Sequence, residues 1–273
     1  MLLQVQDLCS GYGDREIFHQ ASFTVDAGEF ACIIGANGCG KTTMLKCLLG
    51  LLPAFSGSVQ VDGADTLALT ERERARVFAY IPQAHTPPFP FVVSDVVIMG
   101  RTPYINRLAR VTAEDRRIAY EAMELLGIQD IADQTYTELS GGQQQLVLIA
   151  RALAQQAKVL VMDEPTASLD FGNQHMVLEQ MKKLTEGGTA VVMVTHDPNH
   201  ALFCADKVVV MHQGTVIAQG APADVVTDAC LQTIYHARAS IVDVPLASGT
   251  VVKTCVPFLA AEVQEGTGTH ETR

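Results

Sequence analysis

Short apolar runs alternate with amphipathic segments along this chain of 273 residues. Near the N-terminus, Leu2–Leu8 alternates apolar and polar residues, as a half-buried strand does. Ser10–Asp14 is a turn cluster, and Ile17–Val25 is a second candidate strand. Gly57–Gly63 has the composition of a third short strand bounded by glycines. These segments predict an antiparallel sheet that precedes the rest of the fold.

The rest of the chain alternates strand-like and helical segments. Continuous apolar runs typical of buried strands are Phe30–Ile34, Val77–Ile81, Lys158–Met162, Ala190–Thr195 and Val208–His212. Segments with helical spacing or caps are Thr43–Leu49, Thr70–Arg76, Ser140–Leu153 and about Asn173–Leu184. This alternation implies an α/β fold with a mainly parallel sheet and helices on its faces.

A proline-rich stretch, Thr86–Phe91, interrupts this pattern, since proline fixes φ and removes a backbone donor. Beyond it, Ser94–Met99 and Thr112–Leu126 are predicted helices, the second with a threonine cap and acidic residues in its first turn. We expect a helical lobe from roughly Gln83 to Leu139. Together with the next helix it makes a helical subdomain of about residues 84–157, inserted in the core.

An extension, residues 237–273, follows this main domain of residues 1–236. Ile241–Val244 and Thr250–Val252 are strand-like, but the extension is too short to fold independently. We expect it to pack on the main domain. Glu262–Arg273 is polar and rich in glycine and threonine, so we expect this end to fray.

The composition narrows the function. A formal net charge of −11 argues against a general binder of nucleic acid or anionic lipid, because such proteins need a basic surface. The seven cysteines form no C-x-x-C pair, so reduced thiols in a cytosol are expected rather than disulfides or zinc. We expect neither a signal peptide nor a transmembrane helix, since no apolar run approaches the ~18 residues needed to cross a bilayer.

Gly35–Thr43 fits G-x-x-x-x-G-K-[ST] between an apolar strand and a helix, the context of a phosphate-binding loop. Its glycines let backbone N–H groups turn toward a phosphate, and the helix N-terminus adds its positive dipole end. Lys41 is predicted to reach the β- and γ-phosphates, and the Thr42 hydroxyl to ligate Mg²⁺. Taken alone, the pattern can also be a chance glycine-rich turn before a helix.

Asp163 and Glu164 directly follow the apolar run Val159–Met162. A carboxylate at the C-terminal end of a buried strand is well placed to hold Mg²⁺, directly or through water. The adjacent glutamate can orient or deprotonate an attacking water. The alternative is a surface acidic pair that ends a strand, and the upstream loop favours the catalytic interpretation.

Leu139–Gln143 reads Leu-Ser-Gly-Gly-Gln, the signature of the ATP-binding cassette (ABC) transporter ATPases, and the chain resembles that family over about residues 2–236. Further matches at the family's spacing are Leu160–Glu164 to its Walker B segment, Pro165–Asp170 to its D-loop, His196 to its switch histidine, Gln83 to its Q-loop glutamine and Tyr12 to its adenine-stacking aromatic. The resemblance implies a P-loop NTPase (RecA-like) core with an N-terminal antiparallel β subdomain and an inserted helical subdomain.

The resemblance also implies an ATPase that uses ATP and Mg²⁺. The residues it assigns to nucleotide binding are Tyr12, Gly35, Asn37, Gly38, Cys39, Gly40, Lys41, Thr42, Thr43, Ser140, Gly141, Gly142, Gln143 and Asp170. It assigns catalysis to Glu164, His196 and Gln83. The metal ligands it implies are Thr42, Gln83 and Asp163.

Each of these positions also has a plainer interpretation. Without the family, Tyr12 would be turn packing, His196 a satisfied core histidine and Asp170 a helix cap. Ser140–Gly142 is either a second anion site or a simple capped helix start. In the resembled family, two subunits pair head to tail, with each ATP between the loop of one and the Ser-Gly-Gly of the other. The resemblance therefore implies a dimer, and the extension is a candidate for its contact.

One position departs from the family pattern, and another is a variation that the family accepts. Leu146 stands where the family often has arginine, and we expect little effect because that position would not touch phosphate. Cys39 lies inside the phosphate loop. We therefore predict that thiol alkylation inhibits hydrolysis and that ATP protects.

The helical lobe carries the resemblance to a subfamily. Ser94–Pro103 is similar to the stretch found in importers of iron(III)–siderophores, haem and cobalamin, whereas Pro88-Phe89 and Ile105-Asn106 are similar to a subset that imports molybdate or tungstate. The implied protein is the ATP-hydrolysing subunit of a metal-chelate importer, with molybdate as the second choice. Its implied partners are a second copy of itself, transmembrane permease subunits and indirectly a substrate-binding protein, with no nucleic acid. It would lie peripherally on the cytoplasmic face of the cell (inner) membrane.

Other classes remain as alternatives. A soluble, non-transport ABC ATPase acting on ribosomes would carry two cassettes, and one is present. A chromosome-maintenance ATPase would need a long coiled-coil insertion between loop and signature. A small GTPase would need an Asn-Lys-x-Asp motif, which the sequence lacks. An exporter of the same family stays open.

Overall fold

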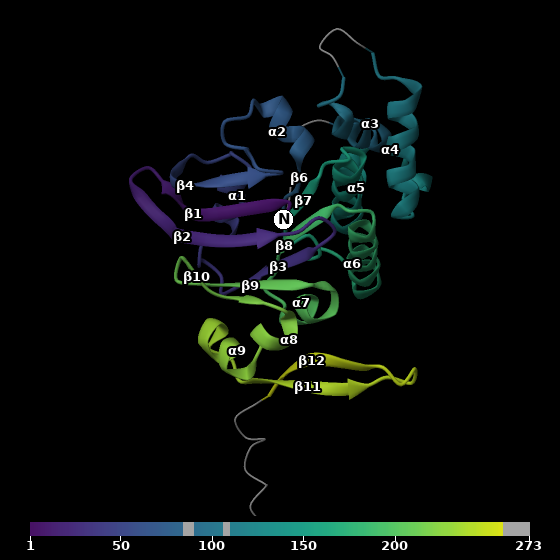
Figure 1. Ribbon diagram of the computed structural model, residues 1–273. Coiled ribbons are helices and arrows are strands. Elements are labelled where there is room, and N and C mark those ends of the chain that lie inside the picture. The colour runs from purple at the N-terminus through teal and green to yellow at the C-terminus, as the bar shows by residue number, and fades with distance from the viewer. Residues whose placement is uncertain (84–89, 106–109, 259–273) are drawn as a thin grey trace, which may run out of the picture.

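The computed structural model describes residues 1–83, 90–105 and 110–258. Its N-terminal part is a four-stranded antiparallel sheet in the order β2-β1-β4-β5 (Figure 1). The strands are β1 Leu3–Tyr12, β2 Arg15–Val25, β4 Ala54–Val61 and β5 Ala64–Asp65. The predicted antiparallel sheet is therefore confirmed. The turn expected over Ser10–Asp14 is narrower, because β1 continues until Tyr12 pairs with Arg15.

The central sheet has six strands in the order β10-β9-β3-β8-β7-β6. They are β3 Phe30–Ile34, β6 Phe78–Ile81, β7 Val159–Asp163, β8 Ala190–Val194, β9 Lys207–His212 and β10 Thr215–Gly220. Neighbouring strands from β9 to β6 run parallel, and β10 pairs antiparallel with β9 at the edge. Every residue of β3, β7 and β8 is buried, which explains their unbroken apolar runs.

Side chains on the two faces of this sheet enter two separate hydrophobic clusters. Phe30, Cys32 and Ile34 of β3 point into one cluster, while Ala31 and Ile33 point into the other, as strand alternation requires. The helices that cover the faces or flank the core are α1 Lys41–Leu48, α2 Glu71–Val77, α5 Gly141–Ala154, α6 Phe171–Glu186, α7 Pro198–Cys204, α8 Pro222–Val225 and α9 Asp228–Tyr235. The expected P-loop NTPase architecture is confirmed.

The helical lobe projects from the upper edge of the sheet (Figure 1). Its elements are α3 Val93–Ile98, α4 Ala113–Leu125 and the short 3-10 turns Met99–Arg101, Gln129–Ile131 and Tyr136–Glu138. The predicted cap of α4 is present, since Thr112 and Asp115 exchange hydrogen bonds there. Arg101 Nε donates to Asp115 Oδ1 over 3.1 Å, and both side chains are buried. Pro88, Phe89 and Asn106, which carry the resemblance to molybdate or tungstate importers, lie outside the described residues.

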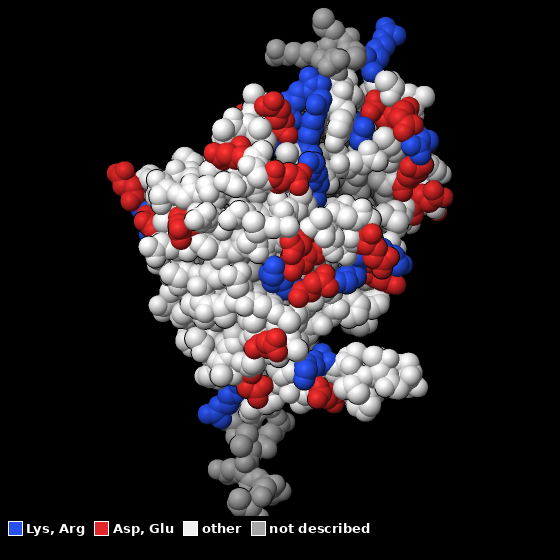
Figure 2. All heavy atoms as spheres, viewed as in Figure 1, with Lys and Arg blue, Asp and Glu red and all other residues white. Residues whose placement is uncertain are grey.

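Helix α2 ties the lobe to the core. Arg72 and Arg76 each donate from Nε to the carbonyl oxygen of Pro103 over 3.0 Å. Arg76 also lies over the ring of Tyr104, 5.5 Å from its centroid. Figure 2 shows basic side chains in a line where the α2 region meets the lobe, with acidic residues on either side. Basic residues thus gather locally in a chain of net negative charge.

The extension begins with a two-stranded hairpin of β11 Ala239–Pro245 and β12 Val251–Pro257 at the lower end of the protein (Figure 1). The strands expected there are confirmed, and the hairpin packs on the main domain through α7. Glu262–Arg273 lies outside the described residues. In the described part of the chain, no helix has both the length and the apolar character to cross a membrane.

Candidate functional site

The glycine loop joins β3 to α1 through backbone shapes that need glycine. Gly38 and Gly40 have φ of 80° and 103°, in the left-handed region that L side chains rarely adopt. A Cβ on Gly35 would lie 2.2 Å from the carbonyl oxygen of Met211, so the close approach to β9 also requires glycine. No described side chain caps the start of α1. The loop therefore presents the first backbone amides of α1 to a ligand rather than to the protein.

Lys41 and Thr42 follow the loop at the start of α1. The Lys41 ammonium is buried and donates to the carbonyl oxygens of Gly35, at 2.7 Å, and Ala36, at 3.0 Å. Thr42 Oγ1 donates to Asp163 Oδ1 over 3.2 Å, which brings the loop and the end of β7 together. The two side chains predicted as metal ligands from distant parts of the sequence are thus neighbours.

Asp163 is the last residue of β7, and 3% of it is exposed. Burial raises the pKa of its carboxyl group, and the nearby Glu164 carboxylate raises this pKa further, while the hydrogen bond from Thr42 lowers it. A buried carboxylate beside a hydroxyl offers hard oxygen ligands of the kind Mg²⁺ prefers. These residues therefore fit the expected ion.

Glu164 stands at the centre of a second set of contacts. Its Oε2 accepts from Gln83 Nε2 over 2.8 Å, and its Oε1 lies 3.1 Å from His196 Nδ1. These three residues come from the ends of β6, β7 and β8, which are neighbours in the sheet. The Glu164 backbone is left-handed, with φ 49°, and its N–H donates to the Val194 carbonyl oxygen.

A cavity of about 390 Å³ lies between these two sets of residues. It is lined by Ile17, Asn37, Gly38, Gly40, Lys41, Thr42, Thr43, Gln83 and Glu164. All of these except Ile17 belong to sequence-predicted motifs. Ile17, on β2, has no motif signal because it looks like any half-buried strand residue.

The signature segment stands apart from that cavity. Of the described residues that line the cavity, none comes from Ser140–Gln143, and Tyr12 and Asp170 are not among them. Ser140 caps α5 and forms a reciprocal capping box with Gln143. Asp170 caps α6 by accepting from Asn173 N–H over 2.9 Å. Within one chain, these residues behave as helix caps, so their predicted nucleotide contacts stay predictions.

The structure shows the surroundings of Leu146 and Cys39. Leu146 is buried in the main hydrophobic cluster, which agrees with the expectation that it does not touch phosphate. Cys39 is 8% exposed, and burial raises the pKa of its thiol, although the nearby Lys41 charge lowers it. All seven cysteines are free thiols, as expected.

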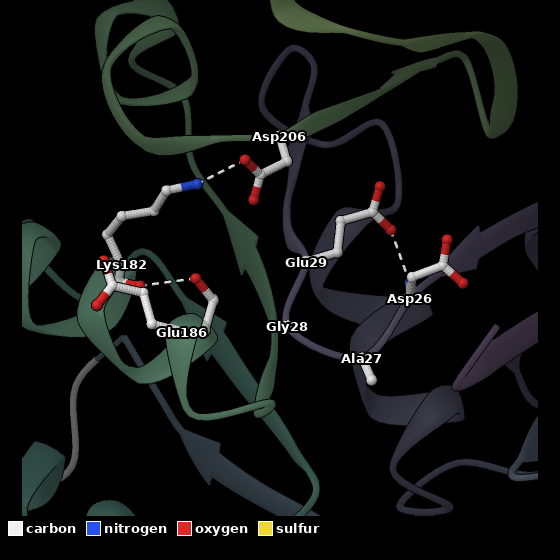
Figure 3. Close-up of a pocket in the computed structure, with 8 residues that line it drawn as sticks. Asp26, Ala27, Gly28, Glu29, Lys182, Glu186 and Asp206 are labelled. Carbon is white, nitrogen blue, oxygen red and sulfur yellow. Dashed lines mark hydrogen bonds and ion pairs between the residues drawn. The ribbon is translucent and has the colours of Figure 1, made fainter.

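A second pocket, shown in Figure 3, lies at the opposite edge of the sheet, where β3 begins. Charged side chains of this pocket are paired within the protein: Lys182 Nζ lies 2.6 Å from Asp206 Oδ1, and Glu29 accepts from Lys207 Nζ over 3.0 Å. Among the described residues, no group of three or more His, Cys, Asp or Glu side chains is arranged to hold a metal ion. The cavity at the carboxyl ends of the strands is the candidate site because residues of the predicted motifs line it.

Comparison with known proteins gives a consistent result. The family model described as ABC transporter matches residues 18–167. An ABC transporter ATP-binding protein of Haemophilus influenzae is 43% identical over 236 residues, which cover 86% of this chain and 90% of the relative. The iron(3+)-hydroxamate import ATP-binding protein FhuC of Bacillus subtilis is 35% identical, over 92% of this chain and 94% of the relative.

A solved structure described as an inward-facing, metal-chelate type ABC transporter is also similar. It superposes with a TM-score of 0.84 at 30% identity. The match covers 96% of this chain and 99% of the solved one, so the similarity includes the helical lobe and reaches into the extension.

Proposed function

This chain belongs to the ABC transporter family of ATP-binding proteins, which hydrolyse ATP to drive transport, and we propose that it powers a membrane importer of a metal chelate. The proposed cargo is of the iron(III)-siderophore, haem or cobalamin type. Two similarities support this class: one relative is named for ferric hydroxamate import, and the similar solved structure for metal chelates. We propose import rather than export for the same reason.

The observation that carries the catalytic proposal is the convergence of three strand ends on one cavity. In the proposed arrangement, Lys41 and the loop amides bind the phosphates of ATP, and Thr42, Asp163 and Gln83 hold Mg²⁺. Bound Mg²⁺ would neutralise charge on the β- and γ-phosphates. Lys41 Nζ donates to two loop carbonyl oxygens, and an ammonium has three donors, so one would be available for a phosphate oxygen.

Glu164 is the proposed base for the attacking water. Its carboxylate faces the cavity, and Gln83 and His196 hold its two oxygens. With both ring nitrogens protonated, His196 would donate from Nδ1 to Glu164 and from Nε2 to the γ-phosphate. Hydrolysis then needs a positioned water between Glu164 and the γ-phosphate.

We propose that the catalytic unit is a head-to-tail dimer. Ser140–Gln143 carries glycine amides at a helix start but does not line the cavity of its own chain, which supports a role at the cavity of a second copy. Tyr12 is the proposed stacking partner of adenine, since 49% of it is exposed at the end of β1. Asp170, at the start of α6, is proposed to face the second copy.

The remaining assignments follow from this architecture. We propose residues 1–236 as the ABC ATPase domain, with the helical subdomain of about 84–157 as the part that meets the permease. The protein would then lie peripherally on the cytoplasmic face of the cell membrane. A substrate-binding protein would deliver the cargo to the permease.

One experiment tests the cargo. The transporter is purified with its permease, and ATP hydrolysis is measured with binding protein loaded with ferric hydroxamate, haem, cobalamin or molybdate. We expect at least one metal chelate to stimulate hydrolysis and molybdate to have no effect. Stimulation by molybdate alone would replace the proposed cargo with an oxyanion. An absence of any permease in the purified assembly would instead favour a non-transport ATPase.

A further inference from the structure

The proposed switch histidine is not fixed by packing. The side chain of His196 is 57% exposed, whereas that of Glu164 is only 14% exposed. The 3.1 Å contact between them therefore depends on the backbone of the loop that carries His196. Contacts that fix this loop therefore also fix the position of His196.

The loop is bonded to the start of α7. Thr195 Oγ1 accepts from the Asp197 backbone over 3.1 Å and lies 3.1 Å from His200 Nδ1. Asp197 in turn caps α7 by accepting from the Asn199 N–H over 2.8 Å. Burial lowers the pKa of His200, while the Asp197 carboxylate, 3.6 Å from its Nε2, raises this pKa. The histidine loop and the first turn of α7 are thus one bonded unit.

Asn199 connects that unit to the extension. Its Oδ1 accepts from the Cys255 N–H over 2.8 Å and from Thr254 Oγ1 over 3.0 Å. Its Nδ2 donates to the Cys255 carbonyl oxygen over 3.3 Å. The side-chain amide therefore pairs with Cys255 as a neighbouring peptide group would. These bonds attach the hairpin β11–β12 to α7 at Asn199, three positions after His196. Figure 1 shows the hairpin below α7 and α8.

We propose that Asn199 is a positioning residue through which the hairpin β11–β12 holds α7, and with it His196, in register with Glu164. This inference rests on the proposed roles of His196 and Glu164 in hydrolysis. Helix α7 has seven residues, and a helix that short is marginal without external support. Ala201 and Cys204 anchor one side of α7 in the main hydrophobic cluster, and the contact with the hairpin is made through Asn199 in its first turn. A two-stranded hairpin is marginal alone, so β11–β12 is also held by this contact.

The test compares variants of the full chain in the purified transporter. Asn199→Ala removes all three hydrogen bonds, and we expect kcat for ATP hydrolysis to fall about tenfold, since small displacements of a catalytic group cost rate. The KM for ATP should stay within about twofold, because the phosphate loop is untouched. Asn199→Asp keeps the Oδ1 acceptor and should recover part of the rate. Faster hydrogen exchange at the Cys255 amide would verify that the contact is lost.

A matched control weakens the hairpin elsewhere. Asp243→Asn breaks the ion pair with Lys253 inside the hairpin, leaves Asn199 bonded, and should hydrolyse ATP at the wild-type rate. Thr254→Val removes one bond to Asn199 without changing α7, so it carries the test if Asn199→Ala does not fold, with an expected loss of about threefold in kcat.

The outcomes separate this inference from the proposed function. A kcat within about twofold of wild type in Asn199→Ala or Thr254→Val, with faster exchange at Cys255, would overturn the positioning role and leave the ATPase assignment intact. A wild-type protein that does not hydrolyse ATP would overturn both.

Discussion

Replacing Glu164 with glutamine removes the proposed base while preserving its surroundings. The new side chain has the same length, and its carbonyl oxygen can still accept from Gln83 Nε2. Its amide group can donate to His196 Nδ1 when that ring nitrogen carries no proton. The left-handed backbone at this position is equally strained for both residues. We therefore expect folding to be unaffected and the chemistry alone to change.

The size of the effect follows from what the carboxylate contributes. A positioned general base is worth typically about 10²–10⁴ in rate, which corresponds to about 3–5 kcal/mol of barrier. ATP binding should persist, because the contacts of Lys41 and the loop amides do not involve Glu164. A protein that binds ATP without hydrolysing it should accumulate as the proposed dimer.

Three measurements on Glu164→Gln check this reasoning: steady-state ATP hydrolysis, calorimetric ATP affinity, and the dimer fraction on size exclusion with ATP and Mg²⁺. The matched control is Glu186→Gln, an exposed residue at the end of α6 that should leave all three unchanged. Turnover within about threefold of wild type would refute the role of Glu164 as base. Equal loss of binding and turnover would indicate a structural role instead.

Further outcomes are expected from other residues. Asp163→Asn should raise the Mg²⁺ concentration needed for half-maximal hydrolysis at least about tenfold. Burial raises the pKa of Asp163 in the wild type, so the Mg²⁺ concentration that the wild type needs should increase as the pH falls toward that pKa. Alkylation of Cys39 should inhibit ATP hydrolysis, and bound ATP should protect against it. Because burial raises the pKa of this thiol, the alkylation rate should keep increasing at pH values above the range of an ordinary thiol. Unchanged inhibition in Cys39→Ser would exclude Cys39 as the site of inhibition. Asp115→Ala leaves the buried Arg101 without its carboxylate and should cost about 3 kcal/mol of unfolding free energy in a denaturant titration, whereas Glu121→Ala, in an exposed ion pair, should cost less than about 1 kcal/mol.

Local patterns predicted most of the elements. The strands β3, β7 and β8 were recognisable because burial on both faces demands unbroken apolar runs. The cap of α4 was recognisable because a threonine and an acidic residue three positions later satisfy each other's backbone. By contrast, β10 and the two-residue β5 gave no prediction, since edge strands with half-exposed side chains carry little apolar signal.

The sequence by itself determined the family and the chemistry, because the glycine loop, the signature and the acidic pair are short contiguous motifs whose spacing carries the information. Which groups meet was decided only by the tertiary structure. The parallel order of β6, β7 and β8 brings Gln83, Glu164 and His196 together, although they are far apart in the chain. The hairpin reaches α7 through Asn199 for the same reason: hydrogen bonds between distant segments depend on how the sheet is ordered, which no local pattern encodes.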